Sequence, residues 1–323
     1  MNLKPRHYLL TALLGLLAFS AFMPFKKKKP DPYLFSYYIN DGASGLHLAW
    51  SEDGFKWTAL NKGKGYIKPD IGDYLMQDPH LSQTPDGMFH LVWATGKNRR
   101  DLGYSRSENL KDWSAQRLIA VMEDDSLILN ASAPELIYDP ANLQFNLLWH
   151  STVPKKFKET DKSLDSMPSG YHFNHRIYRK TSTDLRTWSK SEVFYNPGFS
   201  CSDATIATDS GKIMLFIKDE TRLPKIISKK IKMATSGSVS GPFSAPGPAI
   251  TGKYYAGAPT ALRVDTQLVV YFEKYTKAKM GAVATRNYRD WKDVSDSLSF
   301  PKGAHHGTAL QVPRKLLEKL LEE

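Results

Sequence analysis

Acidic side chains and histidines recur at the starts of five similar short segments along the chain. The residues that open these segments are, in order, Asp78, Glu135, Asp203, Gly257 with Ala258, and His305 with His306. If the five segments lie side by side, the three carboxylates converge. Converging carboxylates shift each other's pKa values, which is how a protein obtains an acid and a base from similar groups. The alternative is that each acid caps a strand end or pairs with a nearby Lys or Arg.

A second set of polar and aromatic residues ends four strongly apolar segments. This set comprises Trp93 to Thr95, Trp149 to Ser151, Lys218 to Glu220, and Glu273 to Tyr275. Hairpin geometry places the end of each such segment beside the start of the segment before it. The loop 153–174 opens onto the same face and could wall a pocket. We therefore predict a site where these starts and ends meet.

The elements that must position these residues repeat five times. Four turns end in tryptophan, and their sequences are SEDGFKW, SENLKDW, STDLRTW and TRNYRDW, with TSGSVSGPF as a degenerate fifth copy. An apolar strand, a more polar strand and a short strand with a polar start recur in the same order. Short strands in repeats of roughly 40–70 residues are typical of a β-propeller, in which the first strand of each blade lines the central channel. We predict an all-β, five-bladed β-propeller.

The two ends of the repeat region predict how the ring closes. The segment LFSYYI (34–39) matches the second strand of a blade, and HHGTAL (305–310) matches a first strand. The N- and C-terminal strands should therefore complete one blade together. The final stretch RKLLEKLLEE reads as a short amphipathic helix outside the ring, and we assign it no function.

Composition excludes several classes of protein. The chain has 323 residues, with 44 Lys and Arg against 33 Asp and Glu, for a net charge of +11. Six of these positive charges and no acid lie in residues 1–30, which leaves +5 for the rest. No sustained basic run remains, so a nucleic-acid partner is not expected. A single cysteine, Cys201, excludes an internal disulfide framework and any multi-cysteine metal site.

Residues 1–30 predict an export signal or a membrane anchor. An apolar run over 8–25 follows Lys4 and Arg6 and precedes the four lysines 26–29. Basic residues before an apolar run are typical of an export signal, but the length also reaches the lower edge of a membrane span. We expect a periplasmic or extracellular protein, either cleaved from this segment or tethered by it, with residues 31–323 as the propeller domain.

The chain resembles glycoside hydrolase family 43, the five-bladed propeller family of arabinofuranosidases, xylosidases, arabinanases and galactosidases. The resemblance covers about 33–312 and rests on QDPHLSQTPDGMFHLVW, NASAPELIYD, FSCSDATI, APTALRV and FPKGAHHGTAL. It implies an inverting mechanism in which Asp78 is the general base and Asp203 tunes and orients the general acid. It also implies that His306 supports a metal ion or water at the axis, such as Ca²⁺, although a structural histidine is the alternative. No cofactor is expected to be required.

The chain departs from this family at the general acid. Pro259 anchors the register of the blade-four motif, so Gly257 stands where the family has a glutamate. We expect a neighbouring acid to substitute, with Glu220 favoured over Glu135 and Glu273. The expected substrate-binding residues are Trp93, Glu135, Trp149, His150, Lys218 and Gly257. Core packing is the alternative for the two tryptophans.

The sequence therefore predicts an enzyme that hydrolyses O-glycosyl bonds in plant-type polysaccharide or oligosaccharide, with arabinosyl, xylosyl or galactosyl units. A monomer with a carbohydrate substrate is expected. The alternative, motivated by Gly257, is a carbohydrate-binding propeller that has lost its general acid and does not catalyse. A protein-interaction propeller with WD repeats fits less well, because such repeats do not gather acids at the channel mouth.

Overall fold

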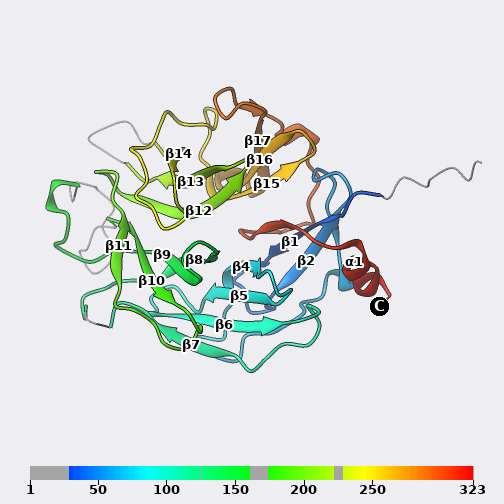
Figure 1. The fold of residues 1–323 in the computed structure, drawn as a ribbon, viewed down its shortest axis with the longest axis horizontal. Coiled ribbons are helices and arrows are strands. Elements are labelled where there is room, and N and C mark those ends of the chain that lie inside the picture. The colour runs from blue at the N-terminus through cyan, green and yellow to red at the C-terminus, as the bar shows by residue number, and fades with distance from the viewer. Residues whose placement is uncertain (1–28, 124, 161–173, 222–227, 323) are drawn as a thin grey trace, which may run out of the picture. The chain divides into compact units, whose positions relative to one another are not determined.

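The computed structural model describes residues 29–123, 125–160, 174–221 and 228–322, and the chain from Asp31 onward forms a ring of five antiparallel sheets (Figure 1). The predicted five-bladed propeller is confirmed. The blades are numbered by the chain order of their first strands. Blade one comprises β4(Gln77–Gln83), β5(Phe89–Ala94), β6(Asp101–Ser107) and β7(Arg117–Ala120), and blade two comprises β8(Ser132–Asp139), β9(Gln144–Ser151), β10(Arg176–Ser182) and β11(Glu192–Tyr195). Blade three comprises β12(Cys201–Asp209), β13(Lys212–Asp219) and β14(Lys230–Ser236), blade four comprises β15(Gly257–Val264), β16(Gln267–Lys274), β17(Lys279–Thr285) and β18(Lys292–Asp293), and blade five comprises β19(Ala309–Gln311), β1(Tyr33–Tyr37), β2(His47–Ser51) and β3(Thr58–Ala59).

Blade five closes the ring from both ends of the propeller, as predicted. Strand β19 pairs with β1, with Leu34 opposite Leu310. The last channel strand is shorter than the predicted 305–310, because only 309–311 form a ladder. His305 instead makes an isolated bridge to Tyr38. Closure with strands from both termini ties the ends of the domain together and leaves no open edge at the seam.

Blade three has three strands rather than the four predicted for every blade. In the described part of the chain, the segment 244–250 takes the outer place beside β14, where it makes an isolated bridge at Ala249 and three separate backbone hydrogen bonds to β14 but no regular ladder. This is the blade with the degenerate turn copy TSGSVSGPF (235–243), which lacks the hydroxyl–acid pattern of the others. The degenerate turn and the irregular outer segment thus occur in the same blade.

The repeated tryptophan turns connect the outer strands through side-chain caps. In the first copy, Ser51 Oγ accepts the Gly54 N–H at 2.9 Å and Asp53 Oδ1 accepts the Phe55 and Lys56 N–H groups. The same pattern recurs at Ser107, Ser182 and Thr285. Short polar side chains that bind their own backbone specify tight turns, which explains why this motif repeats.

Apolar clusters fill the seams between neighbouring blades, and the described residues form one cluster for each of the five seams. Helix α1(Arg314–Leu321) lies outside the ring, as predicted, but it also buries Leu317 and Leu320 in the cluster between blades five and one. Four 3₁₀ turns complete the fold, at Asn61–Gly63, Lys158–Thr160, Tyr275–Lys277 and Ser295–Ser297. Each sheet exposes an apolar face until its neighbour covers it, so ring closure stabilises all blades at once.

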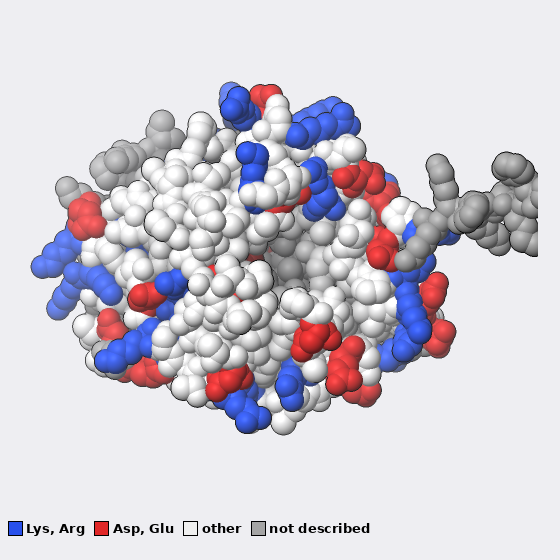
Figure 2. Space-filling model, in the orientation of Figure 1, with Lys and Arg blue, Asp and Glu red and all other residues white. Residues whose placement is uncertain are grey.

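No helix among the described residues is long and apolar enough to cross a membrane. The predicted export signal or anchor falls on residues that, up to 28, lie outside the described part, as do 161–173 of the predicted pocket loop. Both remain predictions. On the face shown in Figure 2, positive and negative side chains alternate around a central hollow, without a continuous basic surface.

Candidate functional site

Four of the five channel strands begin with the same β-bulge. The ladder slips there in each blade, and the bulged residue has a left-handed backbone, with φ of 51° at Asp78, 46° at Ala133, 50° at Asp203 and 55° at Ala258. Such φ values are uncommon for residues with a Cβ, so their repetition marks a fixed device of the blade. Asp78 and Asp203 therefore occupy equivalent places on blades one and three.

The ends of the second strands lie beside these bulges. The ladder pairs the residue before each bulge with one second-strand residue, and in blade five a bridge does the same. These second-strand residues are Ala94, His150, Lys218, Glu273 and Tyr38. The predicted meeting of strand starts and strand ends on one face is confirmed.

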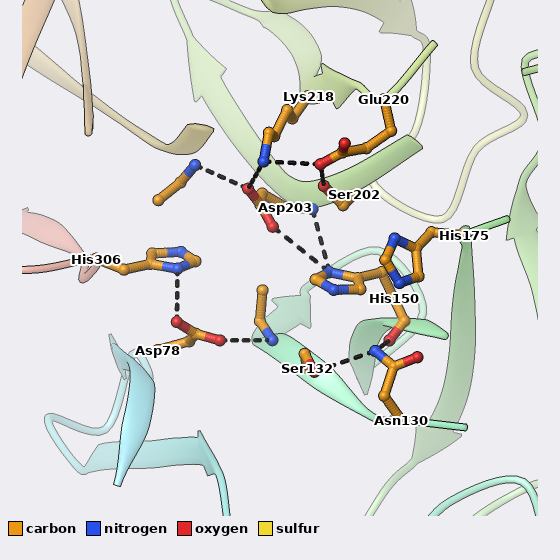
Figure 3. A network of polar contacts seen from close by, with 12 residues as sticks. Asp78, Asn130, Ser132, His150, His175, Ser202, Asp203, Lys218, Glu220 and His306 are labelled. Atoms are coloured by element: carbon orange, nitrogen blue, oxygen red, sulfur yellow. Dashed lines mark hydrogen bonds and ion pairs between the residues drawn. The ribbon is translucent and has the colours of Figure 1, made fainter. Parts of the chain in front are cut away.

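Asp78 is held by both neighbouring blades. Its Oδ1 lies 2.9 Å from His306 Nδ1, and its Oδ2 accepts a hydrogen bond from the Ala133 N–H at 3.1 Å (Figure 3). Burial alone would raise the pKa of Asp78, but the charge and hydrogen bond of His306 hold it below its usual value. Burial alone would lower the pKa of His306, but Asp78 raises it to about 9. At neutral pH the two groups are an ion pair, and Asp78 is an anion that can accept a proton.

Asp203 is likewise held by both neighbouring blades, by Ala258 of blade four and His150 of blade two, and also by Lys218 of its own blade. Its Oδ2 accepts a hydrogen bond from the Ala258 N–H at 3.0 Å and lies 4.0 Å from Lys218 Nζ, and its Oδ1 lies 3.5 Å from His150 Nδ1 (Figure 3). Burial would raise the pKa of Asp203, but the charges of Lys218, His150 and His306 keep it well below its usual value. Burial lowers the pKa of His150. A neutral His150 ring therefore flanks a fixed anion at neutral pH.

Glu220 lies in a lysine cluster next to this group. Its Oε1 is 2.7 Å from Lys218 Nζ and accepts a hydrogen bond from Ser202 Oγ at 3.0 Å, while its Oε2 contacts the buried Lys229. Two ammonium groups stabilise the ionised carboxylate, which has no proton to give. This arrangement argues against the predicted role of Glu220 as the substitute acid.

Gly257 starts blade four with no side chain, and the space beside it is already occupied. A Cβ added there would lie 3.0 Å from Asp203 Oδ2, 3.1 Å from Lys218 Cδ and 3.3 Å from Lys218 Cε. Contacts this short require the neighbours to move. The side chains of Lys218 and Asp203 would therefore have to give by a few tenths of an ångström to admit a side chain at 257, and Lys218 lies beside Asp203.

Glu135 lies deeper in the channel wall, so its predicted place at the strand start, equivalent to Asp78 and Asp203, is wrong. The bulge puts Ala133, not Glu135, at the position of Asp78, and Glu135 lies two residues deeper. Its Oε2 accepts the Ile206 N–H at 2.8 Å, its Oε1 accepts a hydrogen bond from Thr205, and it is 4% exposed. The carboxylate ties blade two to blade three.

The prediction that Trp93 and Trp149 contact substrate is also wrong. Both are fully buried, Trp93 in the cluster between blades five and one and Trp149 in the cluster between blades one and two. Gly103 shows how closely Trp93 is packed, because a Cβ on that glycine would lie 2.0 Å from the indole. Core packing, the alternative stated above, is their role.

Two further residues face the same space: Tyr38, which the sequence did not single out, and His305, which it placed at a strand start. Tyr38 ends the second strand of blade five, and burial together with Asp78, Glu273 and Asp203 raises its pKa, so it is a neutral hydroxyl. His305 Nδ1 lies 2.9 Å from Glu273 Oε1. The signal for Tyr38 was its position in LFSYYI, equivalent to Lys218 and Glu273 in their blades.

The donor set does not fit the axial Ca²⁺ that the resemblance implies. His306 Nδ1 is engaged by Asp78, and a protonated imidazole is no metal ligand. Among the described residues, no group of three or more His, Cys, Asp or Glu is placed to hold a metal. The axial cavity lined by Asp78, His80, Glu135 and His306 has a volume of about 10 Å³, which suits one water molecule.

Comparison with known proteins gives one family and many similar folds. The glycosyl hydrolase family 43-related model, described as "Probable glycosyl hydrolase domain", matches residues 29–318. An α-L-arabinanase from Cellvibrio cellulosa, solved with arabinohexaose, is similar at 15% identity and a TM-score of 0.57, over 85% of this chain and 96% of that one. No curated protein matches.

Two further solved structures share the fold at low identity. An α-L-arabinofuranosidase from Lactobacillus brevis matches at 17% identity and a TM-score of 0.55, over 73% of this chain and 74% of that one. An exo-β-1,3-galactanase from Phanerochaete chrysosporium matches at 12% identity and a TM-score of 0.53, over 75% of this chain and 53% of that one. Likeness at this level supports the fold.

Proposed function

The chain belongs to the glycosyl hydrolase family 43-related domains, and from that premise we propose that it hydrolyses arabinosyl or galactosyl glycosidic bonds with inversion. The observation that carries the proposal is the pair of equivalent carboxylates. Asp78 and Asp203 sit in matching bulges of blades one and three, each fixed by the N–H of the next blade. Two preorganised anions at the mouth of the channel are suited to act on a bound sugar.

In this proposal Asp78 is the general base. Its ionised carboxylate takes a proton from water, and the water oxygen attacks the anomeric carbon from the face opposite the leaving oxygen. Asp203 supplies a fixed negative charge beside the developing oxocarbenium ion. The Ala133 and Ala258 N–H groups keep the two carboxylates in place throughout.

The charges at the mouth favour an uncharged glycan. His306 pairs with Asp78, and Lys218 is shared between Glu220 and Asp203. With its cations paired in this way, the described part of the site offers little to attract a uronate or a sulfated sugar. Arabinan and galactan, which are neutral, match this balance. The similar solved proteins named above act on arabinosyl and galactosyl substrates.

A hydrolysis screen of the full chain tests the proposal. Aryl α-L-arabinofuranoside, β-D-galactoside and β-D-xyloside are assayed beside arabinan, β-1,3-galactan and xylan, and NMR follows the anomeric configuration of the first product. We expect turnover of an arabinosyl or galactosyl substrate with inversion. Tight glycan binding without turnover would instead establish the carbohydrate-binding propeller, and retention of configuration would exclude Asp78 as a base.

Tyr74 provides a platform for the part of a polysaccharide beyond the cleaved bond. It is 66% exposed on the loop that leads into Asp78, with a left-handed φ of 59°. The loop is fixed by hydrogen bonds from the Asp73 N–H to Thr95 O at 2.9 Å and from the Tyr74 N–H to Ile71 O at 3.1 Å. An exposed aromatic ring on a loop with a fixed backbone, next to the site, is suited to stack on a sugar ring.

Tyr74→Ala should raise KM for arabinan or galactan about 3- to 10-fold and leave the aryl glycoside unaffected, because one stacking contact is worth roughly 0.5–1.5 kcal/mol. Leu143→Ala is the matched control. Leu143 is 67% exposed with φ of 51°, but it lies in the β8–β9 turn on the opposite face. Equal effects of both variants on KM would show that Tyr74 does not contact substrate.

A further inference from the structure

Glu273 lies directly across the ladder from Gly257. The two residues are cross-strand partners in β15 and β16 of blade four. A glutamate is therefore present in the expected blade and on the expected rung, but it projects from the second strand instead of the first. The space near Gly257 itself is taken by Lys218 and Asp203. A carboxylate that reaches the site from position 273 avoids this conflict.

The surroundings of Glu273 differ from those of Glu220. Its Oε1 lies 2.9 Å from His305 Nδ1, and its side chain is 16% exposed. The partner of Glu273 is thus one imidazole ring, whereas Glu220 is held by two ammonium groups. His305 is fixed in turn by backbone hydrogen bonds to Tyr38 and by its ring, whose centroid is 5.5 Å from that of Tyr38.

Glu273 also shares its space with the two fixed anions. The pKa of His306 rises to about 9 against the effect of burial, because of Asp78 first and then Asp203 and Glu273. The charges of all three carboxylates therefore act on the His306 ring, although only Asp78 contacts it. Consecutive residues of blade five contact two of them, since His306 binds Asp78 on one side and His305 binds Glu273 on the other.

We propose that Glu273 is the proton donor of this site, an inference that rests on the proposed hydrolysis. Glu273 gives its carboxylic proton to the glycosidic oxygen as the bond from that oxygen to the anomeric carbon breaks. Asp78 accepts a proton from the water whose oxygen bonds to the anomeric carbon. The products are an alcohol and an inverted hemiacetal, and the proton gained by Asp78 returns to Glu273 through solvent. Atoms and charges balance without a co-reactant.

Glu273→Gln tests the proposal through the leaving group. The amide keeps the size of the carboxyl group and can still bond His305, but it cannot donate an acidic proton. We expect kcat/KM on arabinan or galactan to fall about 10²–10⁴-fold, the usual contribution of general acid catalysis. Hydrolysis of a 2,4-dinitrophenyl glycoside, whose leaving group needs no proton, should change less than about 5-fold.

Glu220→Gln is the matched control, because it removes a charge from the neighbouring lysine cluster. It should change natural and dinitrophenyl substrates to the same extent. A leaving-group dependence that appears in Glu220→Gln and not in Glu273→Gln would overturn the inference and return the role to Glu220. Equal losses on both substrates in Glu273→Gln, at an unchanged Tm, would also overturn it.

Gly257→Glu tests whether the acid can act from position 257, where the family has a glutamate, instead of from Glu273. Since Lys218 and Asp203 fill the space near position 257, that variant should not restore the activity of Glu273→Gln. Restoration would show that the first strand is still the competent position for the acid. A wild-type chain that cleaves none of the substrates would contradict the proposed hydrolysis itself, and this inference with it, whereas an active wild type with an unaffected Glu273→Gln contradicts this inference alone.

Discussion

Asp78→Asn is expected to lower kcat/KM about 10²–10⁴-fold on every glycoside that the wild-type chain cleaves. The amide cannot accept a proton from water, although its oxygen can still face His306 and its size matches the bulge. The loss should be similar for poor and good leaving groups, because the base acts on the nucleophile and not on the departing oxygen. A leaving-group series with purified wild type and variant measures this.

Asp86→Asn is the control for the Asp78 substitution. Asp86 lies in the β4–β5 turn at the opposite end of the same hairpin, where it accepts hydrogen bonds from Thr84 Oγ1 at 2.5 Å and from the Met88 N–H at 3.2 Å. This variant should leave kcat/KM unchanged. If Asp78→Asn kept wild-type turnover, Asp78 would be a structural tie between blades one and two, and the base would have to be sought elsewhere.

The fold could be predicted from the sequence because its strands and turns repeat. The four turns with Ser or Thr followed by Asp or Asn cap themselves locally, so the same letters give the same turn wherever they occur. The apolar strands and the split fifth blade follow from alternation and order alone. In blade three the outer segment forms no regular ladder within the described residues, and the turn 235–243 before it lacks the Asp or Asn of the other copies, although Ser236 and Ser238 still accept hydrogen bonds from backbone N–H groups.

The sequence predicted the site residues that occupy equivalent positions of the repeat. Asp78 and Asp203 are equivalent residues, so their convergence could be predicted from the repeat. Glu273 was predicted as a strand-end acid on this face, but its pairing with Gly257, like the position of Tyr38 beside His305, depends on strand register, and a slip of one residue would change it. The lysine cluster of Glu220 follows from the register of the β13–β14 hairpin, because Asp219 pairs with Lys230 and Glu220 lies one step further, next to Lys229.

Glu135→Ala is expected to lower the free energy of unfolding by about 2–5 kcal/mol, because each buried polar group left without its partner costs about 1–3 kcal/mol. The substitution leaves the Ile206 N–H and the Thr205 hydroxyl without their acceptor in the channel wall. His80 Nε2, 3.4 Å from the carboxylate, loses its partner as well. Chemical denaturation of wild type and variant measures the difference.

Glu192→Ala provides the comparison for that measurement. Glu192 pairs with Arg179 at the surface, where the side chain of Glu192 is 57% exposed, so its removal should cost less than about 1 kcal/mol. A Glu135→Ala chain of wild-type stability with collapsed kcat/KM would show that Glu135 contacts substrate, as the sequence first predicted. We expect the reverse result, which is lost stability with near-normal kcat in the folded fraction, because Glu135 is buried in the channel wall. The bulge gives blade two an alanine where blades one and three have an aspartate, and it leaves Glu135 on the layer where side chains join blade to blade.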